Sequence, residues 1–119
     1  KQTRDFIHVY DLVKAIIKAA LSKKNGKIYN VGGGKEVEVN KIAKLIGGKK
    51  IHIPKRPGEP DRSIADISKI KHDLKWKPKI RIEEGIKELI DKIDYWKKAP
   101  IWTPYKIRKV TKTWFKYLK

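Results

Sequence analysis

Apolar side chains recur along the chain in two spacings, one typical of strands and the other of helices. Short apolar runs predict strands at residues 6–9, 27–31, 51–53 and 79–82. Apolar residues three and four positions apart predict helices over residues 12–22, 40–46, 67–74 and 82–93, and from Pro104 onward. Because short strands alternate with helices, the pattern predicts an α/β fold, or α+β if the chain stands alone. Strands this short make a thin sheet, which suggests a partner domain elsewhere.

Residues that cap helices stand at several of the predicted helix ends. Asp11 and Asn40 stand directly before helical patterns and are expected to be N-caps. Thr103 is expected to cap the last helix, because Pro104 suits the first helical position. The apolar face predicted for that helix consists of Ile107, Val110, Trp114 and Leu118.

Residues 54–65 form the longest stretch without periodicity. They hold three of the six prolines together with Gly58, Arg56 and Arg62. Prolines stiffen a loop, so its charged side chains could be held ready for a ligand. An Arg fork matches a diphosphate, and a nearby carboxylate such as Glu59 can accept hydrogen bonds from sugar hydroxyls. An ordinary charged surface loop explains these residues equally well, so both interpretations stay open on this segment alone.

Length and composition exclude several classes of site. The 119 residues suffice for one modest domain. With no Cys, disulfides and thiolate chemistry are excluded, and three scattered His give no metal-ligand spacing. No apolar run approaches the roughly 20 residues of a membrane span, and no signal-peptide pattern is present, so a cytoplasmic location is expected. The chain also lacks Met, even at position 1, and is expected to begin partway through a longer protein.

The chain is strongly basic, with 31 Lys and Arg against 13 Asp and Glu and a formal net charge of +18. Such a field could attract nucleic acid or an anionic membrane, the latter through the Trp-rich tail at residues 96–117. Only five of the basic residues are Arg, and base reading favours Arg. The Lys residues are spread along the chain, which favours a solvated surface. We therefore expect no specific nucleic acid and no membrane, and keep the basic binding module as the alternative.

Other local patterns are better explained by structure than by chemistry. The run at residues 31–35 reads VGGGK and lacks the further glycines of a dinucleotide or Walker loop, so a tight turn is expected. Tyr10 and Lys14 have the spacing of a catalytic pair, but Tyr10 stands before a predicted cap and not within a helix. Asp5, His8 and Asp11 are expected to be structural. No nucleophile, base and acid arrangement is visible.

Four segments, in the right order, resemble one enzyme family. Residues 4–11 read RDFIHVYD, residues 29–34 YNVGGG, residues 56–69 RPGEPDRSIADISK, and residues 76–86 WKPKIRIEEGI. Together they resemble the extended short-chain dehydrogenases that act on nucleotide sugars, with the greatest likeness to UDP-glucose 4-epimerases and dTDP-glucose dehydratases. Lys75 stands where the family usually has Gly before the Trp. The resemblance covers residues 1 to about 96, and the later residues resemble a tail found in some members only.

The resemblance implies roles for particular residues. Arg4 and Arg56 match the two family arginines that bind the diphosphate of the nucleotide sugar. Glu59 matches the acidic residue that bonds the nucleotide ribose, whereas Asp11 and Asp66 match positions taken as structural. No catalytic, cofactor-binding or metal-binding residue is expected in this chain.

The family's glycine fingerprint for NAD and its catalytic Tyr-x-x-x-Lys lie upstream of the strand that here starts at residue 4. The chain is therefore expected to be the C-terminal substrate-binding lobe of a Rossmann-type enzyme, with the lobe over residues 1–96 and a helical tail over residues 97–119 packed on it. The expected parent is an NAD-dependent 4-epimerase or dehydratase that acts on a UDP-hexose. Its expected partners are a nucleotide-diphosphate sugar, the missing N-terminal Rossmann domain and a second copy in a homodimer. The chain alone is expected to be inactive.

Overall fold

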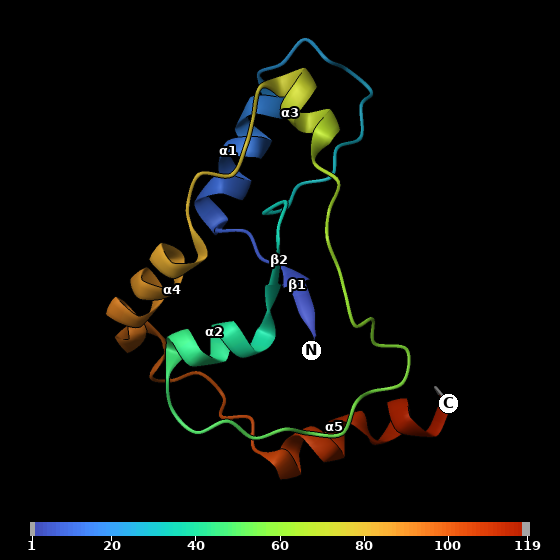
Figure 1. The fold of residues 1–119 in the computed structure, drawn as a ribbon, viewed down its shortest axis with the longest axis vertical. Helices are drawn as coiled ribbons and strands as arrows, with labels where there is room; N and C mark the ends of the chain where they lie inside the picture. Colours follow the sequence, from blue (N-terminus) through green and yellow to red (C-terminus); the bar gives the residue numbers. More distant parts are fainter. Residues whose placement is uncertain (1, 118–119) are drawn as a thin grey trace.

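The computed structural model describes residues 2–117, which form a mixture of helices with one small sheet (Figure 1). In chain order the elements are β1 (Thr3–Asp5), α1 (Val9–Ala20), β2 (Glu36–Glu38), α2 (Val39–Ile46), α3 (Ser68–Leu74), α4 (Ile82–Asp91), the 3₁₀ turn η1 (Ile93–Trp96) and α5 (Pro104–Tyr117). The helices follow the predicted spacing closely. Leu118, assigned from sequence to the tail's apolar face, lies outside the described residues.

The strands differ from the prediction. In the described part of the chain the segments 6–9, 27–31, 51–53 and 79–82 form no ladder, and the sheet consists of β1 and β2 alone. These strands pair antiparallel, with Arg4 opposite Val37 and Asp5 opposite Glu36. An apolar run indicates which side chains are buried, but it does not show whether a neighbouring strand is present to form a ladder. Three side chains from those segments do pack against the core without a ladder, namely Ile7, Tyr29 and Val31.

A small core lies where α1 meets α3 and the segment after it. Its buried members are Ala15, Ile67, Ile70, Leu74 and Trp76. Trp76 is 3% exposed and donates its indole N–H to the carbonyl oxygen of Asp11 at 3.1 Å. Lys18 closes the same junction by donating to the carbonyl oxygens of Leu74 and Lys75, both at 3.1 Å.

Two of the predicted caps are wrong. His8, not Asp11, precedes α1 as its N-cap, and its Nδ1 accepts from the Tyr10 N–H at 3.3 Å. Asp11 is 1% exposed, because its carboxylate bonds a distant part of the backbone. α2 begins one residue before Asn40, at Val39. Thr103 does cap α5, since its Oγ1 accepts from the Lys106 N–H at 3.3 Å.

The molecule is open in shape. Its radius of gyration is 17.5 Å, against about 13 to 14 Å for a compact domain of this length. α5 lies at the far end from α1 and α3, alongside the loop that follows α2 (Figure 1). Within the described residues, no helix is long and apolar enough to cross a membrane.

Candidate functional site

The structure brings together the three side chains singled out from the sequence. Arg56 donates two parallel hydrogen bonds to the Glu59 carboxylate, from Nε to Oε2 at 3.1 Å and from Nη2 to Oε1 at 2.6 Å. Arg4 reaches the same carboxylate from β1, with Nη2 3.3 Å from Oε1. The three residues span 55 positions of the chain yet form one cluster at the irregular loop.

A tight turn positions Arg56 and Glu59. The Glu59 N–H donates to the Arg56 carbonyl oxygen at 3.3 Å, which closes a four-residue turn. Pro57 occupies its second position and Gly58 its third, where Gly58 has a φ of +73°. This combination is the signature of a type II turn, which needs a positive φ at the third residue. An added Cβ on Gly58 would meet no atom within 4 Å, so the backbone angle alone requires glycine.

The ion pairs in the cluster shift the pKa values of its members. The hydrogen bonds from Arg56 are the main cause that holds the pKa of Glu59 below its ordinary value of 4.5. The same bonds raise the pKa of Arg56. Glu59 is therefore a carboxylate at neutral pH, with 17% of its side chain exposed. Two guanidinium groups against one carboxylate leave the cluster with one excess positive charge.

A cavity of about 600 Å³ opens beside this cluster, between α2, the segment 49–55 and the loop. Arg56 and Glu59 lie on its wall. Apolar side chains line another part of it, namely Val39, Ala43, Ile46, Ile51 and Ile53. The charged lining residues are Lys49, Lys50, Lys55, Arg56, Glu59 and Asp61, a net of two positive charges. The cavity thus combines an apolar wall with an anion-attracting rim, as small-molecule sites do.

Arg62, the other arginine of the loop, serves a different purpose. It donates two hydrogen bonds to Glu36 of β2, from Nε to Oε1 at 2.9 Å and from Nη2 to Oε2 at 2.6 Å. Thr3 of β1 also donates to Glu36 Oε1 at 3.2 Å. These bonds tie the end of the loop to the sheet and leave Arg62 away from the Glu59 cluster.

Sequence reasoning missed one contributor, Trp114 of α5. Its indole N–H donates to the carbonyl oxygen of Pro57 at 2.7 Å. Its ring lies beneath the guanidinium of Arg56, with the Arg56 Cζ 5.0 Å from the ring centroid. The sequence pattern assigned Trp114 only to the apolar face of the tail, and the helical spacing contains no signal for a contact 57 residues away.

The carboxylates expected to be structural bond backbone groups. Asp5 Oδ2 accepts from the Ala65 N–H at 2.9 Å and the Gly34 N–H at 3.3 Å. Asp66 Oδ1 accepts from the Ser68 N–H at 2.9 Å, at the start of α3. Asp11 Oδ2 accepts from two backbone N–H groups that precede α4.

The glycine turn packs closely against residues near the start of the chain. A Cβ on Gly33 would lie 2.8 Å from Asp5 Oδ1 and against the Phe6 carbonyl, so this position requires glycine. Across residues 2–117 no three His, Asp or Glu side chains gather as metal ligands would. Where a tight turn was expected, the chain bends at Gly32, Gly34 and Lys35, without a backbone turn hydrogen bond among the described residues.

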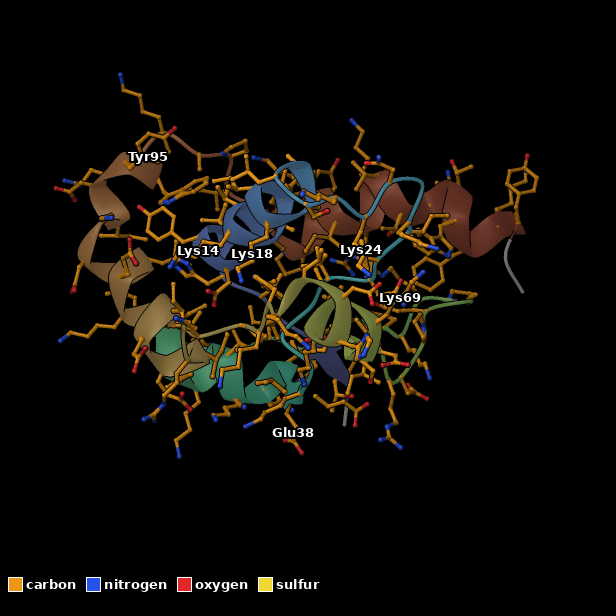
Figure 2. All side chains as sticks on the ribbon, turned by 90° about the horizontal axis from the view of Figure 1, so that it is seen from above. Lys14, Lys18, Lys24, Glu38, Lys69 and Tyr95 are labelled. Carbon is orange, nitrogen blue, oxygen red and sulfur yellow. The ribbon has the colours of Figure 1, made fainter. Side chains whose placement is uncertain are left out.

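A second cavity, of about 680 Å³, lies between α1 and the end of α3. Asp11 and Trp76 line it together with Lys14, Lys18, Lys71, Lys75, Lys77 and Lys79. Figure 2 shows Lys14 and Lys18 on α1, Lys24 beyond it and Lys69 on α3, so the lysines cover several elements. Among the described residues, no Arg lines this cavity and no carboxylate forms an ion pair with its lysines, so the first cavity is the better candidate.

Comparisons with known proteins identify the family of the chain. The sequence model of the GDP-mannose 4,6 dehydratase family matches residues 1–89. A putative UDP-glucose 4-epimerase of Methanocaldococcus jannaschii is 42% identical over 96 residues, which are 76% of this chain and 30% of that protein. The chain thus spans less than a third of the length of this relative.

Solved structures resemble the fold as well. A UDP-glucose 4-epimerase from Thermotoga maritima with UDP-glucose superposes with a TM-score of 0.70 and 32% identity, over 79% of this chain and 32% of that one. A UDP-glucuronic acid 4-epimerase from Bacillus cereus, in complex with UDP-glucuronic acid and NAD, gives a TM-score of 0.69 and 31% identity over the same shares. The expected fold class and the expected resemblance to extended short-chain dehydrogenases are both confirmed. The chain belongs to the GDP-mannose 4,6 dehydratase family.

Proposed function

We propose that this chain forms the nucleotide-sugar-binding part of an NAD-dependent epimerase or dehydratase, with a UDP-hexose as substrate. The observation that carries the proposal is the convergence of Arg4, Arg56 and Glu59 beside the 600 Å³ cavity. One relative of the chain is named a putative UDP-glucose 4-epimerase, and one of the matching structures holds UDP-glucose.

The hydrogen-bonding capacity of the cluster supports a diphosphate ligand. A guanidinium has five N–H donors, and Glu59 takes two of those on Arg56. Among the described residues none accepts from the other three, so Arg56 can bind phosphate oxygens without releasing Glu59. Arg4 likewise donates one hydrogen bond to Glu59 and one to the Thr3 carbonyl oxygen, the latter at 2.7 Å. Glu59, ionised at neutral pH, is the group proposed to accept from a ribose hydroxyl.

The parent reaction is proposed to be 4-epimerisation, in which NAD supplies the oxidation and return of the hydride at the hexose. Residues outside this chain are proposed to hold NAD, because the run at residues 31–35 lacks the glycine fingerprint of a dinucleotide loop. This chain binds and orients the substrate, and by itself it is proposed to be catalytically inactive. The homodimer and the cytoplasmic location stay predictions.

An exposed apolar face on α1 supports the proposal that a second domain packs against this helix. Its members are Val9, Val13, Ile16 and Ile17, followed after the helix by Leu21. Their spacing places them on one side of the helix, whereas Ala15 is buried in the core. Because the chain spans under a third of its relatives' length, we assign this face to a dinucleotide-binding domain.

The test is calorimetric titration of UDP-glucose into the protein expressed from its complete reading frame. Each charge-assisted hydrogen bond contributes about 1.5–3 kcal/mol, so Arg56→Ala should weaken binding by roughly 10- to 150-fold. Arg56→Lys should recover only part of this loss, because an ammonium keeps the charge but lacks the fork.

Arg62→Ala is the matched control. Arg62 stands in the same loop and carries the same charge, but it is bound to Glu36. Its removal should change the affinity for UDP-glucose little. Equal losses from Arg56→Ala and Arg62→Ala would indicate only a general positive field, and no loss from Arg56→Ala would refute the site.

A further inference from the structure

We propose that Trp114 is a positioning residue for Arg56, and that α5 acts as a strap that holds the substrate-binding turn in its binding conformation. The inference rests on the proposed function, since it assigns a role to the tail at the same site. Two contacts carry it, the indole hydrogen bond to Pro57 and the stacking of the indole on Arg56.

The hydrogen bond falls on the one peptide group that decides the type of turn. Type I and type II turns differ by a flip of their central peptide, here the bond between Pro57 and Gly58. The turn's own closing bond uses the Arg56 carbonyl and the Glu59 N–H, so the Pro57 carbonyl is free to accept from outside. Trp114 binds that carbonyl at 2.7 Å. The tail thereby holds the central peptide in the orientation that keeps Arg56 and Glu59 side by side.

The Trp114 ring and Glu59 together restrict the Arg56 guanidinium. One edge of this flat group bonds Glu59 through Nε and Nη2, and its Cζ lies over the Trp114 ring. A planar group bonded along one edge and contacted by a ring can rotate little about its own axes. The remaining edge, which carries the three unused N–H donors, is then presented in a fixed direction. Binding a diphosphate to such an arginine costs less side-chain entropy than binding to a free one.

Trp114 is not part of the hydrophobic core. It is 38% exposed, and no residue of α5 is buried. Its removal should therefore leave the core around Trp76 intact. The tail also offers a matched control in Trp102, which is 61% exposed. Among residues 2–117, Trp102 has no hydrogen bond or cation contact.

The experiment measures UDP-glucose affinity by calorimetry on the protein expressed from its complete reading frame. Trp114→Ala removes both contacts and should weaken binding about 5- to 50-fold. Trp114→Phe keeps an aromatic face for Arg56 but loses the N–H donor, so it should weaken binding by about 2- to 10-fold. Trp102→Ala should leave the affinity within about twofold, because surface substitutions away from such contacts have small effects.

A double-mutant cycle separates positioning from general stability. If Trp114 acts through Arg56, Trp114→Ala should have little further effect in an Arg56→Ala background. Fully additive losses, or no loss from Trp114→Ala while Arg56→Ala weakens binding, would overturn the inference and leave the proposed function standing. An Arg56→Ala variant that binds UDP-glucose as tightly as the wild type would overturn both.

Discussion

The carboxylate of Asp11, in the first turn of α1, holds the backbone of Ile80, 69 residues further along the chain, with its Oδ2 2.8 Å from the Ile80 nitrogen. The neighbouring Lys79 N–H donates to the same oxygen at 2.8 Å. Nearby, the Asp11 carbonyl oxygen receives the indole N–H of Trp76. One residue therefore fixes the path of the chain from α3 to α4.

Removing this carboxylate should destabilise the fold strongly. Asp11→Ala leaves the partly buried N–H groups of Lys79 and Ile80 without their acceptor and should lower the free energy of unfolding by about 1–3 kcal/mol. Asp11→Asn keeps an oxygen acceptor and nearly the same shape, so it should cost clearly less. Urea denaturation of the three proteins checks the order, and an Asp11→Ala variant as stable as wild type would contradict the assigned role.

Substituting glycine for Lys75 should stabilise the protein. Lys75 has φ 48° and ψ 37°, the left-handed conformation at the end of α3, and is the only such non-glycine residue among those described. That conformation costs a side-chain-bearing residue roughly 1–2 kcal/mol, and glycine adopts it freely. After the greater flexibility of glycine in the unfolded chain is allowed for, Lys75→Gly should raise the free energy of unfolding by about 0.5–1 kcal/mol.

Lys77→Gly is the control for this change. Lys77 is also exposed but has no positive φ, so glycine there should lower stability slightly. The urea midpoints of the two variants should move in opposite directions. A parallel shift would mean that the left-handed angle of Lys75 is not strained.

The ion pairs of Glu59 should make stability depend on pH in the acid range. Its folded-state pKa is lowered, chiefly by the hydrogen bonds from Arg56, so the folded state holds fewer protons than the unfolded one as the pH falls. The stabilisation is complete above the ordinary value of 4.5 and is lost as the pH drops through the lower folded-state value. Glu59→Gln cannot titrate and should reduce the slope of stability against pH below about 4.5. Unfolding at several pH values between about 3 and 6 measures this slope, and equal slopes in both proteins would refute the coupling.

The helices could be predicted from the sequence because their signal is local. The spacing of Ile82, Ile86 and Leu89 needs no knowledge of the rest of the molecule, and α4 appears where it indicates. Strand pairing is not local. Residues 36–38 read EVE, a weak strand former, and they pair with β1 where Thr3 and Arg62 bind Glu36. Residues 36–39 do alternate polar and apolar, but the alternation lasts only four residues and does not identify β1 as the partner strand.

The site divides in the same way. The turn at residues 56–59 could be predicted from Pro57 and Gly58, and the grouping of its ion pair follows from adjacency in the chain. The addition of Arg4 came from the resemblance and not from spacing. The contact of Trp114 depends on how α5 lies against the loop, which a helical pattern does not specify.

The long sequence separation of the contacts has a consequence for how the chain folds. The bonds from Asp11 to Trp76 and to Ile80 close loops of 65 and 69 residues, and Trp114 meets Pro57 across 57. The entropy of closing a loop grows only slowly with its length, so the final stability suffers little. The folding rate is lowered more, because the entropy of closing these loops is lost before the non-local contacts contribute any stabilisation. During synthesis from the N-terminus, α1 therefore cannot make its native contacts until α3 and the segment before α4 have been made. The contact between Trp114 and the turn at residues 56–59 forms later still.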